Sequence, residues 1–277
     1  MDNPLVVFSE QMADLVESAG AWTVAVHGRP HRSSSGIYWQ SGVVVTAAHT
    51  VQGDGPVEVT LPGGERGKAE MVGREPRLDL AVLRLSDVSL PVPTFVAGGL
   101  RAGQLALAAG RADDAGMLAG FGAVSAVDRL VRLDFALPPG ISGGAAIDAS
   151  GRVIGMVTGG LSRWSAMVVP AQSVARALEQ ILVKGRVARG YLGIGIQPVP
   201  WKGSTRLIVL NVEPDSPAAA AGLLLGDVLV SAGGSALEEP SDLQAQLEAE
   251  SIGKTLTLAV VRAGEPREVR VLVGERS

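Results

Sequence analysis

The stretch Gly42-Val43-Val44-Val45-Thr46-Ala47-Ala48-His49 places a histidine directly behind an apolar run of β-branched residues. Valine favours strands because its branched side chain packs well on a pleated surface. The stretch therefore predicts a strand over 42–46 that ends in small residues around His49. A lone histidine is more often structural than catalytic, so a functional reading of His49 needs partners elsewhere in the chain.

Short β-rich segments separated by glycine-rich turns surround this strand. The chain contains 36 glycines, which suits tight turns because glycine reaches positive φ without steric cost. Such spacing predicts a barrel or a sandwich over the first two thirds of the chain. The expected strands are 21–27, 42–46, 57–61, 69–73, 80–85, 105–109, 121–127, 131–135 and 153–158.

Two further stretches contain residues that could carry chemistry. Leu78-Asp79-Leu80-Ala81-Val82-Leu83 puts a carboxylate at the mouth of an apolar strand, where burial is costly unless a partner donates hydrogen bonds. Gly140-Ile141-Ser142-Gly143-Gly144 surrounds a serine with glycines, which let a substrate backbone approach and free the amides to face an oxyanion. Taken singly, each stretch also reads as an ordinary turn.

Together, the order His49, Asp79, Ser142 and the residues around each one resemble the chymotrypsin-type serine proteases. That resemblance implies two barrels, the first supplying His49 and Asp79 and the second Ser142. His49 would take the proton of Ser142, and Asp79 would fix the imidazole tautomer. The backbone amides of Gly140 and Ser142 would form the oxyanion hole.

The pattern changes after Pro170. Apolar residues at helical spacing predict a helix over 171–184, and Gly185 is a stop signal. The basic, glycine-bounded stretch 184–190 marks the expected boundary between a domain of residues 1–185 and one of residues 186–277. The second domain should have strands at 191–196, 207–211, 228–232, 255–262 and 267–273, and one helix capped by Ser241.

Three stretches then narrow the resemblance to the HtrA (Deg) family. They are Met167-Val168-Val169-Pro170 before the helix, Arg189-Gly190-Tyr191-Leu192-Gly193-Ile194, and the run from Glu213-Pro214-Asp215-Ser216-Pro217-Ala218 to Gly226-Asp227-Val228-Leu229. The implied fold class is mainly β: a two-barrel, chymotrypsin-like protease domain followed by a small α+β PDZ domain. The implied protein is a serine endopeptidase that cleaves unfolded or exposed protein segments in protein quality control, as a homotrimer built through its protease domains.

A PDZ domain binds a peptide C-terminus as an added strand and holds the carboxylate with backbone amides. By resemblance, those amides belong to residues 191–194, where Gly193 allows close approach and Arg189 adds positive charge. The groove would be lined by strand and helix residues, which are also ordinary core candidates. The expected peptide-binding residues are Arg189, Tyr191, Leu192, Gly193, Ile194, Ile196, Leu243 and Leu247.

The residue before Ser142 departs from the family, which usually has Asp or Asn where this chain has Ile141. A loop without that polar side chain could be held by packing alone, or it could rest with one oxyanion amide turned away. The alternative function is therefore a catalytically impaired, protease-fold scaffold that only binds peptides. If the site is active, the uncharged stretches 137–139 and 156–160 predict cleavage after small or medium apolar residues.

Composition narrows the partners. The chain has no cysteine and three histidines, so we expect no metal and no cofactor. A net charge of −4 without charge runs suggests neither nucleic acid nor an anionic membrane surface as a partner. The apolar run at residues 4–8 is too short for a membrane span or a signal peptide. Taken as written, the chain would be soluble and cytoplasmic, or from the cell envelope if an anchor has been lost.

Overall fold

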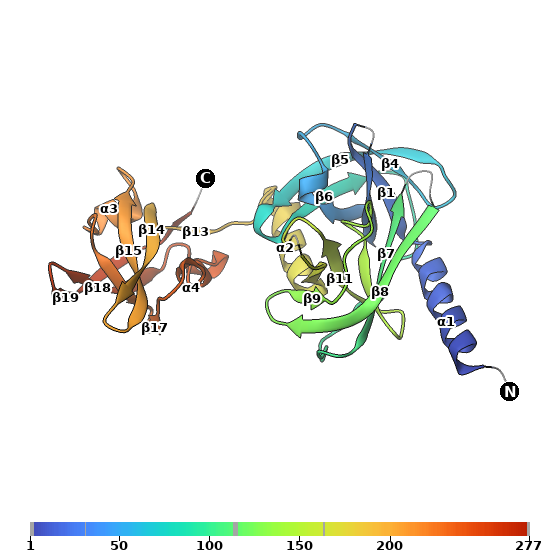
Figure 1. Cartoon of the computed structure of the whole chain (residues 1–277). Coiled ribbons are helices and arrows are strands. Elements are labelled where there is room, and N and C mark those ends of the chain that lie inside the picture. Colours follow the sequence, from blue (N-terminus) through green and yellow to red (C-terminus); the bar gives the residue numbers. More distant parts are fainter. Residues whose placement is uncertain (1–2, 31, 113–115, 163, 276–277) are drawn as a thin grey trace. The chain divides into compact units, whose positions relative to one another are not determined.

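The computed structural model describes residues 3–30, 32–112, 116–162 and 164–275 (Figure 1). The chain forms two compact units, Met1–Arg186 and Val187–Ser277. The first unit contains two closed barrels of six strands each, and the second is a PDZ-like β region with short helices. The predicted fold class, mainly β with two barrels and a small second domain, is confirmed.

The first barrel closes in the strand order β1-β2-β3-β6-β5-β4. Its strands are β1 (Thr23–Arg29), β2 (Arg32–Gln40), β3 (Val43–Ala47), β4 (Val57–Thr60), β5 (Arg66–Glu75) and β6 (Leu80–Leu85). All five residues of β3 are buried, which is the burial that its continuous apolar run predicts. Two 3₁₀ turns, η1 (Ala48–Thr50) after β3 and η2 (Pro76–Leu78) before β6, place side chains at the rim of this barrel.

The second barrel closes in the order β10-β11-β12-β9-β8-β7. Its strands are β7 (Leu105–Ala112), β8 (Gly116–Val127), β9 (Val131–Leu133), β10 (Ala145–Asp148), β11 (Val153–Thr158) and β12 (Met167–Pro170). The glycine-rich loop at Ser142 leads into β10, and β11 ends at Thr158. Both ends matter for the site because they face the first barrel.

Strand β2 was not predicted, because Ser33-Ser34-Ser35-Gly36 reads as a loop. The structure buries six successive residues of this strand, and its hydroxyls are satisfied by hydrogen bonds. Glycine suits position 36, since a Cβ there would lie 2.8 Å from a methyl of Val44 on the neighbouring strand β3.

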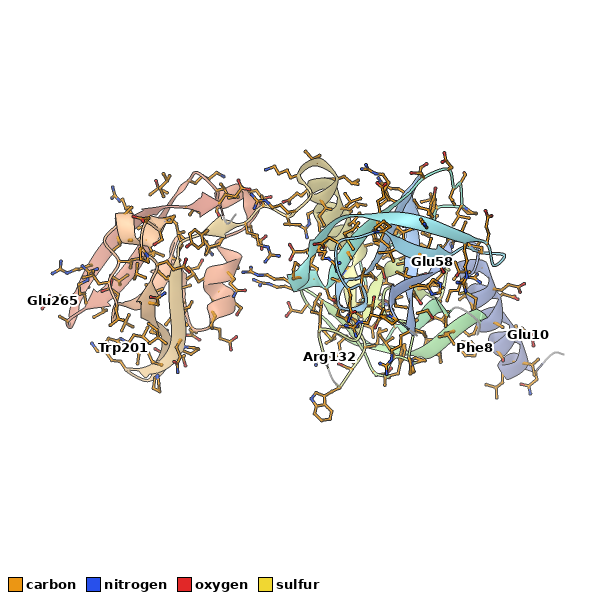
Figure 2. The ribbon with its side chains drawn as sticks, turned by 90° about the horizontal axis from the view of Figure 1, so that it is seen from above. Phe8, Glu10, Glu58, Arg132, Trp201 and Glu265 are labelled. Atoms are coloured by element: carbon orange, nitrogen blue, oxygen red, sulfur yellow. The ribbon has the colours of Figure 1, made fainter. Side chains whose placement is uncertain are left out.

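Helix α1 (Pro4–Ala19) precedes the first barrel and was also not predicted. Asn3 caps it by accepting the Leu5 N–H at 3.0 Å, and Pro4 occupies the first helical turn, a start signal that the sequence does contain. Phe8 (Figure 2) meets Phe121 of β8 edge to face, with ring centroids 5.7 Å apart. Among the described residues, no helix has the length and apolar character needed to cross a membrane.

Helix α2 (Ala171–Lys184) has the predicted bounds and closes the first unit. Its buried face is Ala171, Val174, Ala177, Leu178 and Ile181. Gly185 ends the helix in the left-handed region with φ of 72°, as a C-terminal glycine commonly does. Strand β5 approaches this end so closely that a Cβ on Gly73 would lie 2.1 Å from the carbonyl oxygen of Gly185.

The second unit has its own sheet, in the order β14-β15-β16-β18-β19, and a separate pair, β13 with β20. Its strands are β13 (Gly190–Tyr191), β14 (Ile194–Trp201), β15 (Ser204–Val212), β16 (Val228–Ala232), β17 (Ser235–Ala236), β18 (Thr255–Arg262), β19 (Glu265–Leu272) and β20 (Gly274–Glu275). Its helices are α3 (Pro217–Ala220), α4 (Pro240–Ala245) and the 3₁₀ turn η3 (Ala249–Ser251). Its core includes Leu207, Leu229 and Leu258, none of which is exposed.

Helix α4 begins earlier than the sequence predicted. Glu239 is its N-cap rather than Ser241, and Asp242 returns the bond by accepting the Glu239 N–H at 2.8 Å. The residue types of this capping box are acidic at both positions, so the expected Ser-x-x-Gln pattern pointed two residues too far along the chain.

Candidate active site

Two turns at the rim of the first barrel carry the histidine and the acid. His49 lies in η1, directly after β3, and Asp79 follows η2 with a left-handed backbone, φ of 50°. Aspartate tolerates this conformation better than most residues. The Asp79 carbonyl accepts the Ala48 N–H at 2.8 Å, and its Oδ1 accepts the His49 N–H at 2.8 Å. Asp79 therefore fixes the backbone of the histidine turn as well as its ring.

The carboxylate of Asp79 is only 5% exposed and is held ionised. Burial by itself would raise its pKa, but hydrogen bonds from His49 and Thr158 outweigh burial, so the pKa of Asp79 lies below its usual value. His49 Nδ1 is 2.6 Å from Asp79 Oδ2, and Thr158 Oγ1 at the end of β11 donates to the same oxygen. An ionised acceptor places the ring proton on Nδ1, which leaves Nε2 of His49 free to accept a proton.

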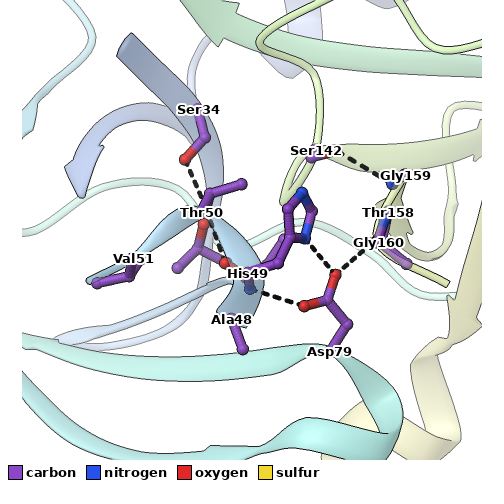
Figure 3. Close-up of polar contacts among 12 residues, drawn as sticks. Ser34, Ala48, His49, Thr50, Val51, Asp79, Ser142, Thr158, Gly159 and Gly160 are labelled. Carbon is purple, nitrogen blue, oxygen red and sulfur yellow. Dashed lines mark hydrogen bonds and ion pairs between the residues drawn. The ribbon is translucent and has the colours of Figure 1, made fainter. Parts of the chain in front are cut away.

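Figure 3 shows the imidazole of His49 between Asp79 and Ser142. The structure thus brings together the three side chains that the sequence proposed as a triad. Ser142 Oγ accepts the Gly159 N–H at 3.1 Å, and no hydrogen bond among the described residues joins it to His49. Such bonds are often long in a free enzyme and tighten when substrate binds.

The loop around Ser142 leaves two backbone amides without a hydrogen-bond acceptor among the described residues. The N–H groups of Gly140 and Ser142 donate to no other group in the described parts of the chain, whereas their neighbours do. Ile141 N–H donates to Pro138 O at 3.2 Å, and Gly143 N–H donates to Val157 O at 2.8 Å. The two free donors are the pair that an oxyanion hole next to Ser142 requires. Gly140 has φ of 95°, so this turn favours glycine.

Ile141 is fully buried within the apolar core of the second barrel. The same buried cluster contains Leu133, Val157 and Val168. Burial of a β-branched side chain stabilises the loop by about 1.5 to 3 kcal/mol relative to an exposed one. Apolar packing therefore holds this residue, where the resemblance led us to expect a polar side chain.

Thr158 was missed as a site residue, although the stretch 156–160 was expected near the substrate. Its hydroxyl is completely buried, donates to Asp79 and accepts the Gly160 N–H at 2.9 Å. Gly160 must be small, since a Cβ would lie 2.6 Å from both Asp79 Oδ2 and His49 Nδ1. A hydroxyl residue followed by two glycines at a strand end was the available signal.

Among the expected PDZ residues, Leu192 and Leu243 are buried in the core of the second unit, and Ile194, Ile196 and Leu247 pack against it in part. Leu247 lies past the end of α4, so it does not line that helix as the sequence predicted. It contributes instead a carbonyl that accepts the Gly190 N–H at 3.0 Å.

The loop over 191–194 contains a glycine with positive φ and backbone amides without an acceptor among the described residues. Gly193 has φ of 78°, and a Cβ on it would lie 2.2 Å from Ser216 Cβ. The N–H groups of Leu192 and Gly193 donate to no described residue. Tyr191 Oη donates to Glu213 Oε2, while Arg189 is half-buried beside this loop in the sequence.

Two closed barrels that jointly present a His–Asp pair and a serine in a glycine loop define a trypsin-like serine peptidase domain, here followed by a PDZ domain. The Trypsin-like peptidase domain family matches residues 34–156, and the PDZ domain family matches residues 190–273. The predicted enzyme class, serine endopeptidase, agrees with the family that matches this first domain and with the printed names of the relatives described next.

This combination of domains is similar to that of the HtrA-type, DegP-like serine proteases, and the predicted resemblance is confirmed. The chain is 32% identical over 274 residues to a probable periplasmic serine endoprotease DegP-like of Brucella suis, covering 89% of this chain and 53% of that protein. The putative serine protease HhoB of Synechocystis is 29% identical over 279 residues, covering 89% and 67%. The chain thus spans about half the length of the DegP-like relatives.

Solved structures agree. The HtrA-type protease AlgW with a tripeptide has a TM-score of 0.80 at 27% identity, covering 96% of this chain and 97% of that one. The serine endoprotease from Yersinia pestis has a TM-score of 0.81 at 25% identity, covering 96% and 98%.

The expectation of a cytoplasmic protein is wrong. The DegP-like relatives from Brucella suis and Halomonas elongata are named periplasmic, which points to the periplasm or cell envelope. The prediction failed because it treated the first residues of the chain as the start of the whole protein, which no residue establishes.

Proposed function

We propose that this chain is a serine endopeptidase in which Ser142 is the nucleophile, His49 the general base and Asp79 the residue that orients the base. The observation that carries the proposal is the Nδ1–Oδ2 bond of 2.6 Å between His49 and Asp79, with Nε2 turned toward Ser142 (Figure 3). With the ring proton on Nδ1 facing Asp79, the other ring nitrogen is the one that lies on the side of the Ser142 hydroxyl.

In the first step Ser142 Oγ leaves the Gly159 amide, gives its proton to His49 Nε2 and bonds to the carbonyl carbon of the substrate. The negative charge that develops on the carbonyl oxygen is received by the Gly140 and Ser142 amides. The C–N bond then breaks, and His49 returns the proton to the departing amine. Water attacks the acyl group, gives a proton to His49, and Ser142 regains its hydrogen as the acid leaves.

Casein digestion and fluorophosphonate labelling test the assignment. Ser142→Ala should abolish both digestion and labelling, because it removes the attacking oxygen. The barrel should keep its fold, because the substitution removes only that one atom. His49→Ala should lose about as much, since residues that act as a unit are not additive. Ser162→Ala, a serine at another described position of the same unit, is the control and should retain full activity.

The alternative, a protease-fold scaffold that only binds peptides, predicts the opposite result. The parent chain would then fail to react with the fluorophosphonate and would digest casein no faster than Ser142→Ala. Cut sites in casein are a further readout, and we expect them after small or medium apolar residues because 137–139 and 156–160 contain no charged side chain.

For the second unit we propose capture of peptide C-termini at the loop 191–194, supported by the two free amides of Leu192 and Gly193. A fluorescent peptide ending in an apolar residue with a free carboxylate should bind, and the same peptide with a C-terminal amide should bind at least tenfold more weakly, roughly the effect of losing one charge-assisted contact pair. Equal binding of the two peptides would contradict carboxylate recognition.

We further propose that the protein removes unfolded or exposed protein segments in the cell envelope and assembles as a homotrimer through its protease units. The support is its likeness to HtrA-type and periplasmic DegP-like proteins. Light scattering should give three times the mass of one chain, and a monomer mass would contradict the assembly without affecting the proposed chemistry.

A further inference from the structure

Ser35 of β2 touches the nucleophile loop at two places, although sequence analysis assigned it no role. It is completely buried. Its hydroxyl donates to Gly140 O at 2.7 Å, and its backbone N–H donates to Ser142 O at 3.0 Å. These bonds run from the first barrel to the second, so one residue links the barrel that carries His49 to the loop that carries Ser142.

The hydroxyl proton of Ser35 has little freedom. Its oxygen accepts the Arg111 N–H at 2.9 Å, which leaves the proton to go to Gly140 O at 2.7 Å or to Arg111 O at 3.3 Å. The shorter contact favours Gly140. Arg111 is itself anchored, because its guanidinium donates to Thr23 O and Gly20 O, both at 2.8 Å.

Ser35 holds the carbonyls of Gly140 and Ser142. These carbonyls belong to the peptide units on either side of the Ile141–Ser142 peptide, so both units are restricted. The opposite ends of the same units are also bonded, since Ile141 N–H donates to Pro138 O and Gly143 N–H to Val157 O. A peptide unit held at both its C=O and its N–H cannot rotate without breaking a buried hydrogen bond. The Ser142 amide between them is therefore kept facing outward.

Two glycines make room for this contact. A Cβ on Gly110 would lie 2.3 Å from Ser35 Oγ, and a Cβ on Gly143 would lie 2.1 Å from Ser35 O. The remaining polar atom of Ser35, its carbonyl oxygen, accepts a hydrogen bond from Thr46 Oγ1 at 2.6 Å. Every polar atom of this buried serine is thus used.

We propose that Ser35 is the positioning residue of the oxyanion hole, and that it fixes from the first barrel the loop that Ile141 has no polar group to tether. The inference rests on the proposed function of Ser142. Packing of Ile141 is then sufficient to hold the loop beside Ser142. The apolar side chain fills the core, and Ser35 sets the orientation of the peptide units around it.

The test compares Ser35→Ala with Ser34→Ala in the full chain. Both remove one buried hydroxyl from the same strand, but Ser34 Oγ bonds to Thr50 Oγ1 at 2.9 Å and Val26 O at 3.4 Å and does not reach the loop. Ser35→Ala should lower kcat on a peptide substrate by at least about tenfold, a fraction of the loss of one oxyanion donor. KM should stay within about twofold, because ground-state binding does not use the hole.

A peptidyl boronic acid, which forms a tetrahedral adduct with the serine, gives a second readout. Its affinity should fall in Ser35→Ala by the same factor as kcat/KM, whereas the affinity for the cleaved product peptide should not change. Ser34→Ala should leave both affinities within about twofold of the parent. Equal losses in the two variants, or a change confined to KM, would overturn the proposal.

Hydrogen exchange of the peptide spanning 138–145 separates this proposal from the proposed function, because exchange needs no activity. The Ile141 and Gly143 amides should exchange faster in Ser35→Ala than in the parent or in Ser34→Ala. If the parent chain were inactive, the proposed peptidase function would be refuted, but this exchange comparison could still be made. If the Ile141 and Gly143 amides were equally protected in Ser35→Ala and in the parent, the role of Ser35 would be refuted. If Ser35→Ala does not fold, Ser35→Cys fills the same space with a much weaker donor and should give a smaller loss of the same kind.

Discussion

Ile141 shows how one side chain can exchange a polar tether for packing. It is 0% exposed and surrounded by apolar residues of the second barrel. Replacing it with asparagine would bury an amide, and the apolar side chains of this core would have no hydrogen bond to offer it. The environment around the position, and not the residue alone, decides which side chain the loop accepts.

We therefore expect Ile141→Asn to destabilise the first unit by about 3 to 5 kcal/mol, the sum of lost apolar burial and an unsatisfied amide. Activity should fall with stability rather than rise. Ile141→Val, which keeps the shape, should lose only about 0.5 to 1.5 kcal/mol. Thermal unfolding of the three proteins measures both effects, and an asparagine variant more active than the parent would show that the loop rests with its hole closed.

At this scale the sequence predicted which side chains meet but not what holds them. The order and neighbours of His49, Asp79 and Ser142 were enough to propose their roles, because each role requires a particular functional group. Thr158 and Ser35 carry ordinary hydroxyls, and their function comes from the three-dimensional contact with Asp79 and with the loop. Such contacts have no signature in local sequence.

Among the elements, β5 and the end of α2 approach each other closely through their backbones. A Cβ on Gly73 would lie 2.1 Å from Gly185 O and 2.9 Å from Ile181 Cγ2. Neither atom can move freely, because Gly185 ends the helix and Ile181 is buried in the core. The two elements can touch only through a residue without a side chain.

Gly73→Ala should therefore destabilise the first unit by about 1 to 3 kcal/mol, as overpacking does, and lower its Tm by roughly 2 to 4 °C per kcal/mol. Gly55→Ala is the matched control, because no atom lies within 4 Å of a Cβ built there. Its Tm should stay within about 1 to 2 °C of the parent. Equal Tm values for the two variants would mean that α2 shifts at little cost.

Elements with strong periodicity were predicted well, and those held by hydrogen bonds were not. Helix α2 has the predicted bounds because its apolar face repeats at helical spacing. Strand β2 was missed because its serines read as loop, yet they are buried with their hydroxyls satisfied. Helix α4 was placed late because its cap is formed by Glu239 and Asp242 rather than by a serine.

At the scale of the whole molecule, the second unit has an ion pair of its own between Asp227 and Arg262. Asp227 is 1% exposed and accepts from Arg262 Nε at 2.7 Å and from Leu224 N–H at 2.9 Å. Burial would raise the pKa of the Asp227 carboxyl, but the hydrogen bonds from Arg262 and Leu224 outweigh it, and the pKa lies below its usual value. A lowered folded-state pKa means that ionisation of Asp227 stabilises the folded unit.

That stabilisation is present above the unfolded pKa of about 3.9 and is lost as pH falls through the lower folded pKa. We expect the unfolding transition of residues 187–277 to lose stability below about pH 4. In Asp227→Asn that part of the pH dependence should disappear, whereas the exposed Glu265 (Figure 2), changed to Gln, should leave it intact. Parallel pH profiles for the parent and Asp227→Asn would contradict the assignment.

The division of the site between two barrels has a consequence for the cell that makes this protein. His49 and Asp79 emerge from the ribosome with the first barrel, while Ser142 and Thr158 follow only with the second. A chain whose synthesis has not yet reached Ser142 has no assembled triad and cannot attack its neighbours. Under the proposed function, the protease becomes dangerous to other proteins only after it has finished folding itself.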